Sequence, residues 1–241
     1  MIEVTHLRKA FGAVCAVRDV SFVAPDGQIT GLLGENGAGK TTTLSMICGL
    51  VESDGGNVRV GSGHGTLIER RRQVGALLDH KGLYDRLTAR ENIEYFGRLH
   101  GLAAGTLASR VDAILQEFGL AQIADRRTAG FSQGERMKVA LGRAVVHSPA
   151  HVLLDEPTNG LDITSVHALR DLLRRLRGQG VCVVLSSHVL DEIRVLCDQI
   201  IIMSRGLVVA AGREESLCHQ AQCATLEDAF LALTSRRELQ A

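Results

Sequence analysis

Tryptophan is absent from this chain, and aromatic residues make up only 3% of it. The sequence therefore offers few side chains on which the bases of single-stranded nucleic acid could stack. An excess of charge is also absent, because 27 Lys and Arg residues balance 27 Asp and Glu residues. This balance argues against a generally basic nucleic-acid binder, and no nucleic-acid partner is expected.

Long apolar runs are missing as well. The longest, such as residues 182–185 and 199–203, fall far short of the roughly 20 residues that a membrane-spanning helix needs. The first residues contain no basic segment followed by an apolar one, so no signal peptide is apparent. These absences predict a soluble, cytoplasmic chain of 241 residues, either one large domain or a domain with an insertion.

No two of the six cysteines are spaced as in a C-x-x-C motif. Cys48, Cys182 and Cys197 lie in apolar stretches, which favours small buried side chains in a reducing compartment. Residues 218–223 contain two cysteines and a histidine that could bind a metal, but their irregular spacing makes this the weaker interpretation.

A glycine-rich segment, residues 34–42, matches G-x-x-x-x-G-K-[ST], the phosphate loop of nucleoside triphosphatases. A short apolar segment typical of a buried strand precedes it, and a helical pattern follows it. Glycine allows backbone N–H groups to approach a triphosphate closely, and the helix N-terminus attracts anions. This context makes a chance glycine-rich turn the weaker interpretation. The nucleotide-binding residues expected here are Gly34, Glu35, Asn36, Gly37, Ala38, Gly39, Lys40, Thr41 and Thr42.

Two acidic residues, Asp155 and Glu156, end a second apolar segment. Alone they would fit the start of a solvated loop. Because active sites of open parallel sheets lie at the carboxyl ends of strands, a preceding phosphate loop favours a functional interpretation. Thr41 and Asp155 are then expected to bind Mg²⁺, while Lys40 lies near the outer phosphates and Glu156 activates a water. His188 ends the next apolar segment, either as a structural histidine or as a donor to the γ-phosphate.

Short apolar strands alternate with helical patterns along much of the chain, which indicates a parallel sheet covered on both faces. Residues 9–12 and 54–56 are expected to be turns, and residues 207–211 an edge hairpin. Phe11 either stacks on a nucleotide base or closes a small β-layer. The expected strands are residues 2–7, 17–22, 28–33, 57–60, 74–78, 151–154, 181–185, 199–203 and 207–211.

Residues 87–148 show helical spacing without a clear strand. Thr88, with Glu91 three residues later, predicts a capping box at the start of a helix. Residues 226–233 predict a last helix, followed by a frayed tail at 235–241. The middle of the chain is therefore expected to be a helical insertion between strands of one sheet.

With these residues assembled, the chain resembles the nucleotide-binding subunit of ATP-binding-cassette (ABC) transporters over nearly its whole length. The sequence F-S-Q-G-E at residues 131–135 is similar to the family signature, usually L-S-G-G-Q. Residues 155–162 resemble the acidic strand end that runs into the family's dimer-contact loop. His188 falls at the family's switch histidine, and Phe11 falls at its base-stacking aromatic.

The resemblance implies an α/β fold, the P-loop NTPase of the ABC type. It would have a mostly parallel core sheet flanked by helices, an N-terminal antiparallel β-layer and an inserted helical subdomain. Residues 1–241 would form a single ABC ATPase domain. Its parts would be a catalytic core with the β-layer at 1–86 and 149–212, a helical signature subdomain at 87–148, and a C-terminal helix and tail at 213–241.

The resemblance also implies that two such subunits close head to tail around two ATP molecules. Ser132 and Gly134 of one subunit would then meet the γ-phosphate held by Lys40 of the other. Glu156, His188 and Lys40 would be the catalytic residues, with ATP and Mg²⁺ as cofactors. Further nucleotide contacts would come from Phe11, Asp79, Ser132, Gln133, Gly134, Glu135 and Asp162, and Asp79 would join Thr41 and Asp155 as a metal ligand.

Three residues depart from the family pattern. Gln133 and Glu135 replace the usual Gly and Gln of the signature, and Asp79 stands where the family has a metal-contacting Gln. Residues 83–93 and 225–230 resemble the two-component exporters, which include sodium-efflux and drug-efflux systems. Residues 83–101 would face the permease.

The function expected from the resemblance is that of an ATP-hydrolysing subunit, peripheral on the cytoplasmic face of the inner or plasma membrane. It would power an exporter whose integral membrane permease is formed by separate chains. The alternatives are a soluble ABC-type ATPase acting on ribosomes or nucleic acid, and a regulatory ATP-binding subunit with low hydrolysis.

Overall fold

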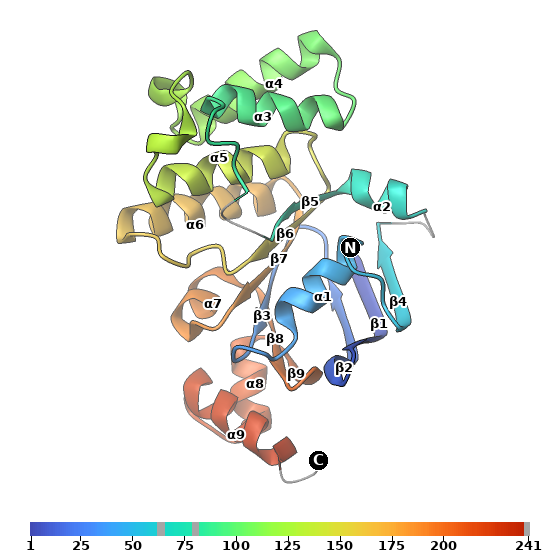
Figure 1. Ribbon diagram of the computed structural model, residues 1–241. Helices are drawn as coiled ribbons and strands as arrows, with labels where there is room; N and C mark the ends of the chain where they lie inside the picture. Colours follow the sequence, from blue (N-terminus) through green and yellow to red (C-terminus); the bar gives the residue numbers. More distant parts are fainter. Residues whose placement is uncertain (62–65, 79–81, 239–241) are drawn as a thin grey trace.

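The computed structural model describes residues 1–61, 66–78 and 82–238 (Figure 1). Within these residues the strands form one nine-stranded sheet in the order β4-β1-β2-β9-β8-β3-β7-β6-β5. In that order the strands are Gly55–Val60, Ile2–Phe11, Val14–Ala24, Leu207–Gly212, Gln199–Ser204, Ile29–Leu33, Cys182–Ser187, His151–Asp155 and Val74–Leu77.

The parallel part of the sheet contains the apolar strands that the sequence predicts. β3 pairs in parallel with β8 and β7, and β6 pairs in parallel with β7 and β5. Every residue of β3, β6 and β7 is buried, because helices cover both faces of a parallel sheet. The register pairs Leu33 with Ser187 and Asp155 with Ser186, so the carboxyl ends of the three strands meet at one edge of the sheet.

The N-terminal part is antiparallel and larger than predicted. β1 pairs with β2 and with β4, and the β1–β2 ladder continues to Phe11 and Val14. The turn expected at residues 9–12 is therefore wrong, because only Gly12 and Ala13 connect the strands and Gly12 takes a positive φ of 58°. The turn expected at 54–56 is also displaced, since β4 already begins at Gly55.

The helices fall into three groups (Figure 1). α1 (Lys40–Ile47), α6 (Ile163–Gly178) and α7 (Leu190–Leu196) accompany the parallel strands, and α2 (Leu67–Gln73) precedes β5. α3 (Ala89–Leu99), α4 (Ala104–Glu117) and α5 (Gln133–Val145) gather at one end of the molecule, with short 3₁₀ turns at Ala121–Ile123 and Thr128–Gly130. α8 (Glu214–Ala221) and α9 (Leu226–Glu238) lie at the opposite end.

Two details of the C-terminal third correct the sequence-based expectations. β9 is not an edge strand, because it lies between β8 and β2, and the sheet ends at β4 and β5. Two helices, not one, follow β9, and the second continues to Glu238 in place of a tail frayed from Ser235. Gln222, in a left-handed conformation, ends α8 and allows the chain to turn into α9.

The predicted capping box at the start of α3 is confirmed, because the Thr88 hydroxyl accepts from Glu91 N and the Glu91 carboxylate accepts from Thr88 N. Across the described residues, none of the helices has the length and apolar character needed to cross a bilayer.

Candidate active site

The phosphate loop connects β3 to α1. Gly39 stands at the N-cap of α1 with a left-handed φ of 98°, and a Cβ there would lie 2.6 Å from the Ala16 carbonyl oxygen. A Cβ on Gly34 would lie 2.4 Å from the Met203 carbonyl oxygen. Both positions thus require glycine, and the first N–H groups of α1 have no side-chain cap. Uncapped N–H groups at a helix start suit a phosphate.

Lys40, the first residue of α1, extends its side chain back over the loop. The side chain is only 5% exposed, and Nζ donates to the carbonyl oxygens of Gly34 at 2.6 Å and Glu35 at 3.2 Å. Its third neighbour is the Glu156 carboxylate, whose Oε1 lies 3.3 Å from Nζ. The ammonium group therefore links the phosphate loop to the acidic end of β6.

Asp155 is the buried end of β6 and receives two hydroxyl groups. Thr41 Oγ1 donates to Oδ2 at 2.7 Å, and Ser186 Oγ donates to Oδ1 at 2.5 Å. Burying a carboxylate is costly unless hydrogen bonds compensate, and both oxygens are satisfied here. The resulting group of hydroxyl and carboxylate oxygens is of the kind that Mg²⁺ prefers. Asp79, the third predicted metal ligand, lies outside the described residues.

Glu156 lies between Lys40 and His188. Its Oε2 is 2.8 Å from His188 Nδ1, and its backbone N–H donates to Ser186 Oγ at 2.9 Å. The φ of Glu156 is 46°, in the left-handed region that non-glycine residues seldom adopt. The backbone thus turns sharply after β6 and directs the carboxylate toward the phosphate loop.

The signature segment forms the N-terminus of α5. Ser132 is the N-cap and accepts from Glu135 N at 3.3 Å, while the Glu135 carboxylate accepts from Ser132 N at 2.7 Å. Glu135 therefore completes a capping box within its own helix. Gln133 Nε2 donates to the Asn159 carbonyl oxygen at 3.1 Å, which joins the signature to the loop that follows Glu156.

The starts of α5 and α6 are in close contact. A Cβ on Gly134 would lie 2.1 Å from Ser165 Oγ, so only glycine fits between the two helices. Asp162 caps α6 by accepting from Ser165 N at 2.8 Å, and this hydrogen bond lowers the pKa of the Asp162 carboxyl. Figure 1 draws α5 well away from α1, so one chain does not bring its signature to its own phosphate loop.

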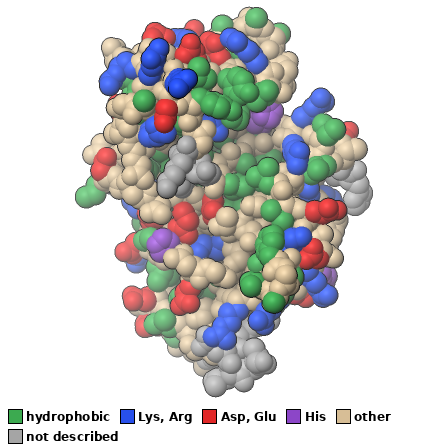
Figure 2. All heavy atoms as spheres, viewed as in Figure 1, with side chains coloured by type: hydrophobic (Ala, Val, Ile, Leu, Met, Phe, Trp, Pro, Cys, Tyr) green, Lys and Arg blue, Asp and Glu red, His purple; other side chains and the backbone are tan. Residues whose placement is uncertain are grey.

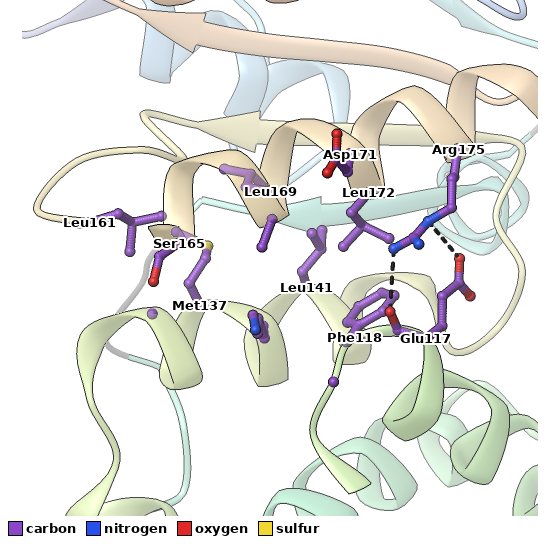
Figure 3. A pocket seen from close by; sticks show the side chains of 14 residues that line it. Glu117, Phe118, Met137, Leu141, Leu161, Ser165, Leu169, Asp171, Leu172 and Arg175 are labelled. Carbon is purple, nitrogen blue, oxygen red and sulfur yellow. Dashed lines mark hydrogen bonds and ion pairs between the residues drawn. The ribbon is translucent and has the colours of Figure 1, made fainter. Parts of the chain in front are cut away.

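A pocket of about 270 Å³ lies between α5 and α6 (Figure 3). Met137 and Leu141 from α5 face Leu169 and Leu172 from α6 across it. At the far end, Arg175 Nη2 donates to the Glu117 carbonyl oxygen at 3.3 Å, and Nε lies 3.5 Å from Glu117 Oε1. α6 thus packs against α5 along this pocket and is joined to the end of α4 through Arg175 and Glu117.

Phe11 lies at the tip of the β1–β2 hairpin and is 51% exposed. The Lys9 ammonium lies 5.5 Å from its ring centroid. Residues 218–223 form no metal centre: across the residues described, no group of three or more His, Cys, Asp or Glu side chains could hold a metal ion.

Known proteins share this fold and these motifs. Residues 17–159, more than half of the chain, match the ABC transporter family. The chain belongs to this family. It is 40% identical over 240 residues to the ABC transporter ATP-binding protein NatA of Bacillus subtilis, covering 96% of this chain and 97% of that protein. It is 34% identical over 234 residues to the Nod factor export ATP-binding protein I of Ralstonia nicotianae, covering 94% and 72%.

The fold agrees with that assignment. A solved ATP-binding subunit of an ABC transporter superposes with a TM-score of 0.87 at 30% identity, covering 97% of this chain and 99% of that one. The ABC-type P-loop NTPase fold and the ATPase activity predicted from the sequence are confirmed. The protein is the ATP-binding subunit of an ABC transporter and hydrolyses ATP to drive transport.

Ser186 and Glu192 of this ABC subunit were not predicted as site residues. Ser186 contacts both Asp155 and the backbone of Glu156. Its only sequence signal is its position just before Ser187 and His188 at the end of an apolar strand. Its role depends on the pairing of Asp155 with Ser186 across β6 and β7, which a single strand does not encode.

Proposed function

We propose that this subunit powers a membrane exporter from the cytoplasmic face, by closing on a second ABC ATPase subunit around ATP. The observation that carries the proposal is that Glu156, at one edge of the sheet, contacts both Lys40 and His188: Lys40 Nζ lies 3.3 Å from Oε1, and His188 Nδ1 lies 2.8 Å from Oε2. The export assignment is supported by the similarity to the Nod factor export ATP-binding protein I.

The phosphate loop suits the triphosphate of ATP. Backbone N–H groups of residues 34–42 and the uncapped start of α1 would receive the phosphate oxygens, with Lys40 supplying the neighbouring positive charge. Thr41 and Asp155 would hold Mg²⁺, which neutralises charge on the phosphate oxygens during transfer. The half-exposed ring of Phe11 supports stacking on the base over closure of the β-layer.

Hydrolysis would depend on Glu156 and His188. Glu156 would orient the attacking water and accept its proton, which requires a carboxylate directed at the γ-phosphate. His188 holds that carboxylate through Nδ1, and Lys40 lies on the opposite oxygen. The carboxylate is thereby contacted at both oxygens, and His188 would act as a donor to the γ-phosphate through its other ring nitrogen.

The signature would act on the nucleotide of the opposite subunit. Ser132 and the N–H groups at the start of α5, a helix of 13 residues, offer donors to an anion. Glu135 accepts from Ser132 N within its own helix, so its charge is engaged at the α5 terminus. This arrangement supports a signature that works despite the departure from the family pattern at Glu135 and Gln133.

The permease would dock on an apolar surface between α2 and α3. Five hydrophobic side chains there are at least 41% exposed, and Figure 2 shows hydrophobic side chains gathered over α3 and in the hollow beside it. A pocket of about 300 Å³ beside them is lined by Phe96, His100 and His147. Exposed apolar groups in such number are typical of protein interfaces. We call the five exposed hydrophobic residues the docking surface; they are Leu50, Leu67, Ile68, Tyr95 and Leu99.

Replacement of the proposed general base tests the function. Glu156→Gln should lower ATP turnover by about 10² or more and should retain ATP in a dimer that size-exclusion chromatography detects. Glu215→Gln, an exposed carboxylate in the first turn of α8, is the matched control and should keep wild-type turnover. Wild-type turnover in Glu156→Gln would remove the catalytic assignment. A wild-type protein that binds but does not hydrolyse ATP would instead indicate a regulatory subunit.

A further inference from the structure

We propose that Glu192, on α7, is a positioning residue that sets the relation between Glu156 and His188. The proposal rests on the roles given above to those two residues. A single oxygen of the Glu192 carboxylate, Oε2, accepts hydrogen bonds from Thr158 Oγ1 and from Ser187 Oγ. Thr158 follows Glu156 by two residues, and Ser187 directly precedes His188. One carboxylate thus joins the two segments that carry the catalytic pair.

The first arm of this connection supports the backbone of Glu156. That residue has a φ of 46°, which is unfavourable for a side chain with a Cβ. The turn is closed by Asn159 N, which donates to the Glu156 carbonyl oxygen at 3.1 Å. Thr158 lies inside this turn, is 7% exposed, and directs its hydroxyl to Glu192. Glu192 therefore anchors the turn that holds Glu156 in its strained conformation.

The second arm supports the backbone around His188. The Ser187 hydroxyl accepts from Val189 N at 3.0 Å and so spans His188. The same hydroxyl donates to Glu192 at 3.1 Å, and Ser187 is fully buried. Because a hydroxyl has only one hydrogen, donation to Glu192 leaves its lone pairs free to receive Val189 N. Glu192 thereby orients the hydroxyl that fixes the His188 turn.

These contacts form a closed network that links the two turns at both ends. On one side Glu156 Oε2 and His188 Nδ1 are 2.8 Å apart, and on the other side Thr158 and Ser187 meet at Glu192. Release of Glu192 would remove the one side chain that contacts both turns, and each would keep only its separate contacts, such as Glu156 N to Ser186 Oγ and Val189 N to Ser187 Oγ. A displacement of about 1 Å at reacting groups can cost about 10² in rate. A small shift of Glu156 or His188 after loss of the Glu192 contacts is therefore expected to lower turnover.

The variants separate geometry from charge. Glu192→Ala removes the acceptor, and we expect kcat to fall about 10-fold or more while KM for ATP stays within about twofold, because the phosphate loop is untouched. Glu192→Gln keeps a carbonyl oxygen that can accept from both hydroxyls, and it should restore kcat to within about threefold of wild type. Asp191→Asn, one residue earlier and 84% exposed, controls for the loss of an acidic residue from the first turn of α7.

Thr158→Val and Ser187→Ala remove one donor each and provide the test if Glu192→Ala does not fold. Each should lower kcat with KM little changed, and where Glu192→Ala folds, each should lower kcat less in that background than additivity predicts. Wild-type kcat in Glu192→Ala, or in both donor variants, overturns the proposal. So does a Glu192→Gln variant as slow as Glu192→Ala. Loss of turnover in Glu156→Gln with wild-type turnover in Glu192→Ala leaves the proposed function standing and removes only this inference.

Discussion

The Thr41 hydroxyl donates to the Asp155 carboxylate over 2.7 Å and so joins the start of α1 to the end of β6. This contact connects the phosphate loop to the acidic strand end. It places two oxygen ligands side by side, one from each motif, where each alone would be a weak metal ligand. The metal site that we propose is therefore a property of the sheet edge, created by the parallel pairing of β3, β7 and β6.

Asp155→Asn tests that metal site. Asparagine keeps one acceptor oxygen for either Thr41 or Ser186, places an NH₂ donor at the other position, and loses the negative charge that attracts Mg²⁺. We expect the Mg²⁺ concentration for half-maximal ATPase activity to rise by about 10-fold or more. Asp171→Asn, an exposed residue of α6, should leave the Mg²⁺ titration unchanged. The same Mg²⁺ dependence in Asp155→Asn and wild type would exclude Asp155 as a ligand.

Gly134→Ala tests the close contact between α5 and α6. The new Cβ would lie 2.1 Å from Ser165 Oγ and 2.9 Å from Ser165 Cβ, so the signature helix has to move away from the core. Overpacking of this kind costs about 1–3 kcal/mol, and ATP turnover should fall because the signature is displaced. Thermal unfolding and ATPase assays measure the two effects.

The matched controls for Gly134→Ala use the same chemistry elsewhere. A Cβ on Gly105, in α4, meets nothing within 4 Å, so Gly105→Ala should not destabilise the protein. Adding Ser165→Gly to Gly134→Ala removes both close atoms and should recover most of the lost stability in a double-mutant cycle. Additive losses in that cycle would show that the contact is not the cause.

Local patterns in the sequence predicted the parallel strands and the phosphate loop because each is a short, strongly apolar or glycine-rich segment. They did not predict the length of β1, whose last residues Lys9 and Phe11 pair with Val17 and Val14 in an exposed hairpin. Nor did they predict that β9 is internal. Its place depends on a bridge between Asp19 and Leu207, residues far apart in the chain.

The candidate site was predictable where each residue belongs to a recognisable motif. Lys40, Asp155 and Glu156 follow from their motifs, and the structure brings them together. Ser186 and Glu192 carry no such signal, since serine and glutamate are common residues. Ser186 reaches the site because the register of β7 places it opposite Asp155. Glu192 reaches it because α7 lies beside the turn after β6, where Thr158 donates to Glu192. Only the folded chain defines these two arrangements.

Ile68→Glu and Leu99→Glu test the docking surface. Each replaces a side chain that is 65% exposed, so the isolated subunit should fold normally and keep its basal ATPase activity. Burial of an unpaired charge at an interface is costly, so co-purification with the permease from native membranes should be lost. Leu231→Glu, on α9 and 55% exposed, is the control and should keep the permease bound. Retention of the permease by both docking-surface variants would place its contact elsewhere.

His147 should make stability fall in mild acid. Burial, with the neighbouring charges of His100 and Arg110, lowers its pKa from 6.5 to about 4, and its ring stacks on His100 at 3.6 Å. Between these values the unfolded chain binds a proton that the folded protein does not, so stability is complete above pH 6.5 and is lost as the pH falls toward 4. For one such group the loss between about pH 7.5 and pH 5.5 is about 1 kcal/mol. His147→Gln should reduce the difference in unfolding free energy between those two conditions by this amount in urea titrations, whereas the exposed His219→Gln should not. An unchanged difference in His147→Gln would mean that another group titrates.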